Sequence, residues 1–148
     1  MSTVFEIGIT EKNNQEIERK ETIEVIASKG IIGDRYFHDF NGDCEQITLI
    51  ESENIDYYNK TFNTNFNYLE FRRNIITKDI QLNNLVGKTI SVGKIKLKVN
   101  DLCRPCKDLQ NGLGKNNIIK EFLRRGGLRC EILSSGTINV GDKIVINT

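Results

Sequence analysis

Two of the four cysteines in this sequence stand close together, at Cys103 and Cys106. The thiolate is the form of cysteine that attacks electrophiles or binds metals, and neighbouring positive charge favours it. Arg104 and Lys107 flank Cys106, and Pro105 stiffens the backbone beside it. Four interpretations fit these residue types: a thiol that ligates a soft or high-valent metal or carries sulfur, a redox dithiol, half of a zinc site, or two packed thiols in a loop.

The rest of the sequence offers little support for the zinc and dithiol interpretations. A zinc site needs two further ligands at suitable spacing, and His38, Cys44 and Cys130 each stand alone. A proline precedes Cys106 as in thioredoxin-like motifs, but the βαβ pattern that accompanies those motifs is absent from the sequence. Cys130 lies in an apolar stretch and is expected to be packed in the core. With a single histidine in the chain, a histidine-rich metal site is nearly excluded.

A second group of potential ligands resembles part of a calcium loop. Asp39, Asn41 and Asp43 have the one-three-five spacing of such a loop. Cys44 stands where the loop needs glycine, and Ile50 stands where it needs glutamate. The spacing therefore does not predict a calcium site of this kind.

A basic triplet, Arg72-Arg73-Asn74, falls in a stretch expected to form a short strand over residues 71–76. Arginine side chains can bind a phosphate through two parallel hydrogen bonds, and asparagine can hydrogen-bond a heterocycle. The triplet therefore predicts either an anion-binding site or an exposed basic strand end.

The composition is that of one ordinary globular domain spanning residues 1–148, with 38% apolar and 28% charged residues. A formal net charge of +1 gives no argument for binding nucleic acid or a membrane surface. No stretch of about 18 apolar residues exists to span a bilayer. The first residues lack the basic and apolar regions of a secretory signal, so we expect a cytoplasmic protein with reduced thiols.

Short alternating apolar runs separated by Gly, Asn and Asp predict a mainly β structure. The clearest alternation, over residues 95–99, has Ile95, Leu97 and Val99 on one face and lysines on the other. Strands are also expected over residues 4–9, 22–26, 46–50, 71–76, 88–92, 128–133 and 143–146, with turns at 134–136 and 139–142. Helices are expected over residues 51–62 and 117–125. These elements favour a mainly β fold with a few short helices, built as a mixed, closed or nearly closed β-barrel.

The motifs occur in an order that resembles the MOSC family, named for the C-terminal domain of molybdenum-cofactor sulfurases. The resemblance is clearest over residues 20–148, and its order and spacing are more specific than any single motif. The matching segments are Lys29-Gly30-Ile31-Ile32-Gly33-Asp34-Arg35, Glu45-Gln46-Ile47-Thr48-Leu49-Ile50-Glu51, Phe71-Arg72-Arg73-Asn74-Ile75, Leu85-Val86-Gly87-Lys88, Cys103-Arg104-Pro105-Cys106, Gly126-Gly127 and Gly136-Thr137-Ile138-Asn139-Val140-Gly141-Asp142.

The resemblance implies a barrel-like β fold that binds the molybdenum cofactor, a molybdenum–pterin compound. Cys106 matches the cysteine that ligates molybdenum in the amidoxime-reducing members. Arg72 and Asn74 match an Arg-x-Asn pattern that contacts the pterin, and Arg73 stands where those members tend to have proline. We also expect Lys29, Asp34 and Arg35 at the cofactor: Lys29 to neutralise phosphate, and Asp34 to hold Arg35 or Arg72. The family is also associated with pyridoxal phosphate, but no lysine of this chain can be assigned as its Schiff-base residue, so this cofactor is kept only as a family label.

Three functions follow as hypotheses. In the first, Cys106 ligates the cofactor, and the chain is an oxidoreductase that removes oxygen from N-hydroxylated substrates with electrons from a separate electron-transfer protein. In the second, the chain is a sulfur or cofactor carrier that exchanges with a donor or acceptor protein through a persulfide or the cofactor at Cys106. In the third, it is a non-catalytic binding domain with inert thiols.

Overall fold

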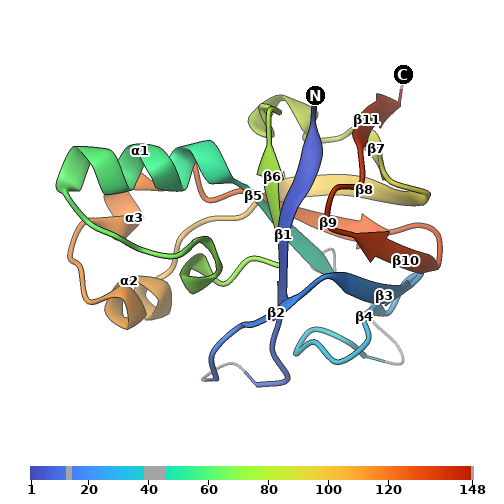
Figure 1. Ribbon diagram of the computed structural model, residues 1–148, viewed down its shortest axis with the longest axis horizontal. Coiled ribbons are helices and arrows are strands. Elements are labelled where there is room, and N and C mark those ends of the chain that lie inside the picture. The colour runs from blue at the N-terminus through green and yellow to red at the C-terminus, as the bar shows by residue number, and fades with distance from the viewer. Residues whose placement is uncertain (13–14, 39–45, 148) are drawn as a thin grey trace.

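The computed structural model describes residues 1–12, 15–38 and 46–147 and is built on one eight-stranded sheet (Figure 1). In sheet order the strands are β11 (Ile144–Asn147), β7 (Thr89–Val92), β8 (Ile95–Leu102), β9 (Leu128–Ile132), β5 (Ile47–Glu51), β6 (Ile75–Lys78), β1 (Thr3–Ile9) and β2 (Glu18–Lys20). A three-stranded sheet contains β10 (Gly136–Asn139), β3 (Thr22–Ile26) and β4 (Gly30–Ile31). The calcium-like spacing at 39–43 and Cys44 lie outside the described residues.

The large sheet curls strongly into a half-barrel that is not closed, and its two edge strands are β11 and β2. β5 and β6 run parallel, so the sheet is mixed. At one end, Val4 N–H donates to the Asp142 carbonyl (2.9 Å) and Ile144 N–H to the Ser2 carbonyl (2.9 Å). The mainly β, barrel-like fold expected from the sequence is confirmed. The sequence left open whether the barrel is closed or nearly closed, and the structure shows that it is not closed.

Two apolar clusters lie on opposite faces of the large sheet. The inner cluster contains the predicted alternating residues Ile95, Leu97 and Val99, which are all buried. The outer cluster includes Ile50 and Ile76, which alternate with inward-facing neighbours on β5 and β6. Helices must therefore cover this outer face, because a sheet that is apolar on both faces is buried on both.

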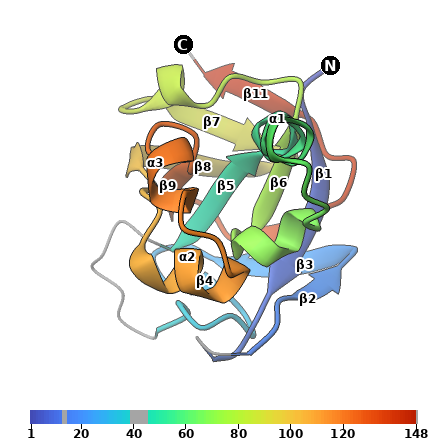
Figure 2. The same cartoon turned by 90° about the vertical axis from the view of Figure 1, so that its left-hand side faces the viewer.

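Three short α-helices provide that cover: α1 (Ser52–Phe62), α2 (Lys107–Leu113) and α3 (Ile118–Glu121). Figure 2 looks at the molecule from this side and shows the helices in front of β5, β6 and β9. Two 3₁₀ turns, η1 (Tyr68–Phe71) and η2 (Asn83–Leu85), complete the described elements. None of the helices among the described residues is long and apolar enough to cross a membrane.

The structure corrects four local predictions. The helix expected over residues 117–125 covers α3 alone, since the chain leaves helical geometry at Phe122. α2 was not predicted, and β10 occupies part of a segment interpreted as turns. The basic triplet does not lie in a strand: η1 ends at Arg72, which has a left-handed backbone (φ 64°), and β6 starts at Ile75. A positive φ at a non-glycine residue is incompatible with a continuous strand here.

Candidate functional site

Cys106 is exposed at the start of α2 and acts as its N-cap. Its Sγ accepts a hydrogen bond from the backbone N–H of Leu109 at 3.5 Å, so the sulfur is held close to the helix backbone. Arg104 and Lys107 are also exposed on either side, while Pro105 between them is buried. This arrangement gives one thiol that is oriented by its backbone, open to solvent and flanked by two cations.

The other two described cysteines are buried. Cys103 is 6% exposed and its N–H donates to the Gly127 carbonyl at 2.7 Å. Cys130 is fully buried in β9, and burial, with a further contribution from Cys103, raises the pKa of its thiol. A thiol kept protonated in this way is a poor nucleophile and metal ligand. The expectation that Cys130 packs in the core is confirmed, and accessibility separates Cys106 from the other two.

Asp101 lies between two arginines near the cysteine loop, a feature that the sequence analysis did not identify. Its carboxylate lies 3.4 Å from Arg104 and 3.6 Å from Arg129, and the Leu102 N–H donates to it at 2.7 Å. The hydrogen bond from Leu102 is the main cause of a lowered pKa of Asp101, and the two arginines add to it. Asp101 therefore remains charged and orients Arg104 beside the cysteine motif.

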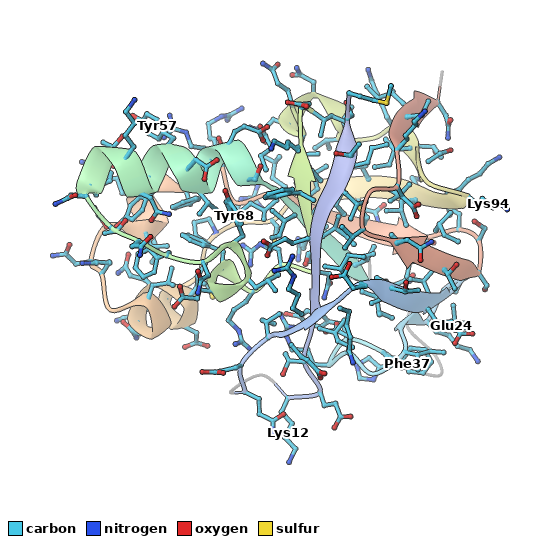
Figure 3. The ribbon with its side chains drawn as sticks, viewed as in Figure 1. Lys12, Glu24, Phe37, Tyr57, Tyr68 and Lys94 are labelled. Atoms are coloured by element: carbon cyan, nitrogen blue, oxygen red, sulfur yellow. The ribbon has the colours of Figure 1, made fainter. Side chains whose placement is uncertain are left out.

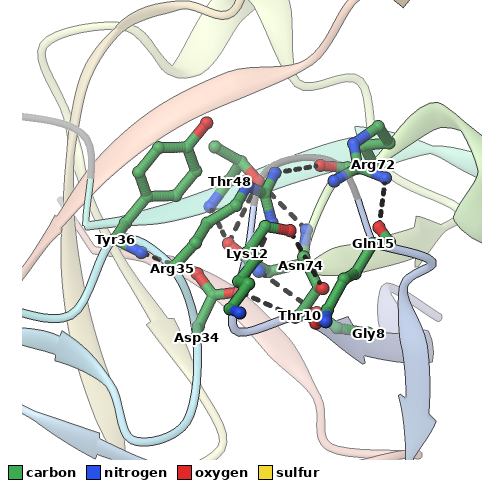
Figure 4. A network of polar contacts seen from close by, with 10 residues as sticks. All are labelled: Gly8, Thr10, Lys12, Gln15, Asp34, Arg35, Tyr36, Thr48, Arg72 and Asn74. Atoms are coloured by element: carbon green, nitrogen blue, oxygen red, sulfur yellow. Dashed lines mark hydrogen bonds and ion pairs between the residues drawn. The ribbon is translucent and has the colours of Figure 1, made fainter. Parts of the chain in front are cut away.

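Asp34 is buried and holds the start of a polar network (Figure 4). It accepts hydrogen bonds from the Thr10 N–H (3.1 Å) and from the Arg35 guanidinium (3.4 Å). Burial raises the pKa of Asp34 although these contacts oppose the shift. Asp34 thus contacts Arg35, one of the two arginines named in the prediction, and the place of both residues at a cofactor stays a prediction.

Arg35 in turn supports Arg72. The Arg35 side chain is 7% exposed, lies over the Tyr36 ring and donates to the Arg72 carbonyl at 3.0 Å. Arg72 is half-buried, and its guanidinium donates to the Gln15 carbonyl at 2.8 Å. Partial burial, together with the nearby charge of Arg35, lowers the pKa of Arg72. Two guanidinium groups are thus close together, which an anion would stabilise.

Arg73 turns away from Arg72 and into the structure. It is 8% exposed, and its Nε–H donates to the Gly126 carbonyl at 2.8 Å while Nη1 donates to the Phe71 carbonyl at 3.3 Å. Gly126 itself packs so closely against the Cys103 carbonyl that a Cβ at this position would overlap that oxygen. Arg73 therefore connects the basic triplet to the cysteine loop as a structural residue.

Asn74 is completely buried, with its side chain engaged by protein groups (Figure 4). Its Oδ1 accepts from the N–H and the hydroxyl of Thr48, both at 3.1 Å, and its Nδ2 donates to the Gly8 carbonyl at 3.1 Å. A direct contact with a ligand would require breaking these bonds. The contact predicted for Asn74 remains a prediction, and the structure gives this residue a role in joining β5, β6 and β1.

Lys29 lies half-buried in the turn between β3 and β4, outside the network drawn in Figure 4. Its carbonyl accepts from the N–H of His38, which is an exposed loop residue. Among the residues that the structure describes, no three His, Cys, Asp or Glu side chains gather to hold a metal ion by themselves.

A cavity of about 860 Å³ adjoins this region between α1, η1, α2 and the β1–β2 hairpin. Arg72 lines it, as do Leu109 and Leu113 of the helix that Cys106 caps. No local pattern in the sequence predicts this cavity, because its wall combines segments that are far apart in the chain. The structure thus brings Arg35 and Arg72 together, and places Cys106 one helical turn before a residue of the cavity wall.

The chain is thus a mainly β half-barrel with helices on its outer face and an exposed cysteine that caps one of those helices. The MOSC domain model matches residues 37–145, and the chain belongs to the MOSC domain family. No match was found among curated proteins.

Solved structures share the fold at low sequence identity. The YuaD protein from Bacillus subtilis has 15% identity and a TM-score of 0.84, with 99% of this chain and 96% of that chain covered. YiiM from Geobacillus stearothermophilus has 16% identity and a TM-score of 0.81, with 100% of this chain and 76% of that chain covered. YiiM from Escherichia coli has 16% identity and a TM-score of 0.76, with 100% of this chain and 70% of that chain covered.

Proposed function

We propose that this protein binds the molybdenum cofactor with the thiolate of Cys106 as a metal ligand. The single observation that carries the proposal is the exposure of Cys106 in a position fixed by its hydrogen bond to Leu109. A metal ligand must be reachable and oriented, and a soft sulfur donor suits an oxidised molybdenum centre. Membership of the MOSC family is consistent with a cofactor of this kind.

The charges near Arg72 also fit such a group. Arg35 and Arg72 are close enough for one to lower the pKa of the other, and Asp34 balances one of the two charges. A phosphate beside Arg72 would offset the remaining repulsion and accept hydrogen bonds from its guanidinium. Arg35 would act as a positioning residue, because its largely buried side chain holds the Arg72 carbonyl.

Residues of the cysteine loop and of the cavity wall would hold different parts of the cofactor. Cys106 would hold the metal, Arg104 and Lys107 would place two positive charges beside it, and Arg72 would bind the anionic end of the cofactor. When bound, the cofactor supplies a centre for oxygen-atom transfer. Asp101 keeps Arg104 oriented near the thiol.

We further propose that the protein is a reductase of N-hydroxylated compounds and takes electrons from a separate electron-transfer protein. The second candidate, a sulfur or cofactor carrier, uses the same exposed thiol, since a persulfide also needs an accessible sulfur. The two differ in what they require: a reductase must respond to a substrate and an electron donor, whereas a carrier must exchange with a donor or acceptor protein.

The test is the molybdenum content of protein purified under reducing conditions from a host that makes the cofactor. We would compare the wild type with Cys106→Ser and with Cys130→Ala, a matched control that removes a buried thiol. The proposal expects near-stoichiometric molybdenum in the wild type and the control, and a loss in Cys106→Ser. If all three variants lack molybdenum, the metal-ligand role is wrong, and intact-mass detection of a persulfide on Cys106 would favour the carrier.

A further inference from the structure

Positive charge in this chain is concentrated in residues 104–129, the segment that carries α2 and α3. Seven basic and two acidic residues give this segment a net charge of +5, whereas the whole chain has a net charge of +1. Figure 2 shows α2 and α3 on the side of the molecule that carries the helices. Five of the basic residues are exposed: Arg104, Lys107, Lys115, Lys120 and Arg124. This segment therefore attracts negatively charged molecules, although the chain as a whole is nearly neutral.

Exposed apolar side chains lie among these cations at the end of α3. Leu123 is 56% exposed and stands in the chain between the exposed Lys120 and Arg124. Tyr57 of α1 is 48% exposed, and the Arg125 guanidinium lies over its ring, 4.4 Å from the centroid. We call Tyr57, Lys120, Leu123, Arg124 and Arg125 the α3 surface. Its composition is that of a protein interface, in which Tyr and Arg are enriched and a polar rim surrounds an apolar centre.

The α3 surface is held in place and adjoins the loop of the exposed thiol. The Asn83 side chain donates to the Arg124 carbonyl at 2.7 Å and so ties the surface to η2. Gly126, which follows the surface in the chain, packs against the Cys103 carbonyl, and Cys106 lies three residues beyond Cys103. A partner bound here would therefore lie beside the segment that carries the proposed metal ligand. A surface that is already ordered also loses little conformational entropy on binding.

The α3 surface fits a soluble acidic protein better than a membrane. A helix that binds a membrane surface presents a long apolar face to the lipid. α3 has only four residues, Ile118–Glu121, and its Ile118 is buried in the protein. Carboxylates of another protein can instead pair with Lys120 and Arg124 while an apolar side chain contacts Leu123. Electron-transfer proteins form small, transient interfaces of this kind.

We infer that the α3 surface is the docking site of a small acidic electron-transfer protein. The partner's carboxylates would steer it to the basic segment, and contacts with Leu123 and Tyr57 would orient it. The partner's role as electron donor rests on the proposed reductase function. Docking itself can be measured without the cofactor, because no residue of the α3 surface belongs to the proposed cofactor site.

Surface plasmon resonance with the purified full chain tests the inference against two immobilised acidic probes, a flavodoxin and a plant-type ferredoxin. We expect saturable binding of at least one probe. Its affinity should fall at least about tenfold between roughly 0.01 M and roughly 0.15 M salt, as the Debye length shortens from about 30 Å to about 8 Å. Lys120→Glu and Arg124→Glu should each weaken binding by about fivefold or more. Lys94→Glu makes the same charge change as Lys120→Glu, but Figure 3 shows Lys94 at the opposite end of the molecule from Tyr57, so it should weaken binding less than about twofold.

A further variant separates a specific interface from simple charge attraction. Leu123→Ser leaves the net charge unchanged and should still weaken binding by about threefold or more, because it removes the apolar centre of the surface. Leu123 is exposed, so this variant should unfold within about 0.5 kcal/mol of the wild type. Absence of binding to both probes at low salt would overturn the inference. Equal weakening by Lys94→Glu and Lys120→Glu would also overturn it, as would binding to phosphatidylserine vesicles in place of either probe, which would assign the surface to lipid.

The same measurements keep this inference apart from the cofactor proposal. Cys106→Ser protein should bind the probe with the affinity of the wild type, since Cys106 is not part of the α3 surface. Molybdenum in a wild type that binds neither probe would refute this inference alone. Docking by a wild type that lacks molybdenum would refute the cofactor proposal alone.

Discussion

Replacing Asn74 by alanine would distinguish a structural role from a ligand-binding role. The Asn74 side chain is fully buried and joins three strands through Thr48 and Gly8. Alanine would leave the Thr48 N–H and the Gly8 carbonyl without their side-chain partner in the interior. The Thr48 hydroxyl would retain the hydrogen bond that it accepts from the Asn74 backbone N–H at 3.0 Å. Two backbone groups therefore lose their partner on this substitution.

The expected destabilisation follows from these two groups. A buried donor or acceptor left unsatisfied costs about 1–3 kcal/mol, so Asn74→Ala should lower the free energy of unfolding by about 2–6 kcal/mol. For a chain of this size, 1 kcal/mol shifts the melting temperature by roughly 2–4 °C. The melting temperature should therefore fall by roughly 4–24 °C, even in protein that has no cofactor.

Thermal and urea unfolding of cofactor-free protein measure this effect. Asn84→Ala provides the matched control, because Asn84 is exposed in η2, and its change should stay within about 0.5 kcal/mol of zero. If Asn74→Ala unfolds like the wild type but loses molybdenum when made in a cofactor-producing host, the structural reasoning is wrong. Asn74 would then contact the ligand directly, as the family resemblance implies.

Three further predictions concern the sheet, an acidic side chain and the cavity. Gly127 has a φ of +97°, and a Cβ at this position would overlap the Leu49 carbonyl. Gly127→Ala should therefore destabilise the fold by at least about 3 kcal/mol in urea unfolding. A smaller loss would mean that β5, which contains Leu49, and β9, which follows Gly127, can move apart. Burial raises the pKa of Glu51 above 4.5, so its folded form favours the protonated state and stability is lost as pH rises through that pKa. The melting temperature of Glu51→Gln relative to wild type should thus increase from about pH 4 to about pH 7, and a constant difference would contradict the burial argument. The hydrogen bond to Asp56 is the main cause of the raised pKa of Tyr68, about 12, so Asp56→Asn should lower this pKa toward 10 in an ultraviolet titration. An unchanged pKa would contradict the hydrogen bond between these two residues of the cavity wall.

The elements that depend on local pattern could be predicted from the sequence. The alternation of residues 95–99 predicted β8 because a strand with one buried face repeats every two residues. α1 was predicted for the same reason at helical spacing, and Ile55 and Tyr58 are buried as expected. In both elements the spacing of apolar residues, which can be read from a few neighbouring positions, indicates which face is buried.

Elements fixed by caps and distant contacts were harder to predict. α2 is only seven residues long and is capped by a cysteine, which is not among the usual N-cap residues. The turn at η1 did leave a signal, since Asn67 and Glu70 form a capping box three residues apart, and this signal would have placed Arg72 after a turn and outside a strand. The partners of Asn74 come from β1 and β5, and no local pattern identifies them.

From the sequence, Arg72, Arg73 and Asn74 were expected to form one ligand-binding group. In the structure each of the three side chains has a different role. Arg72 lines the cavity, Arg73 donates to the Gly126 carbonyl, and Asn74 joins the strands beneath. Gly126 packs on the Cys103 carbonyl, three residues before Cys106. Arg73 thus connects the segment that carries the cavity arginine to the segment that carries the exposed thiol. The cavity arginine and the exposed thiol are therefore held in a fixed relation by buried neighbours, an arrangement that would position the proposed cofactor precisely.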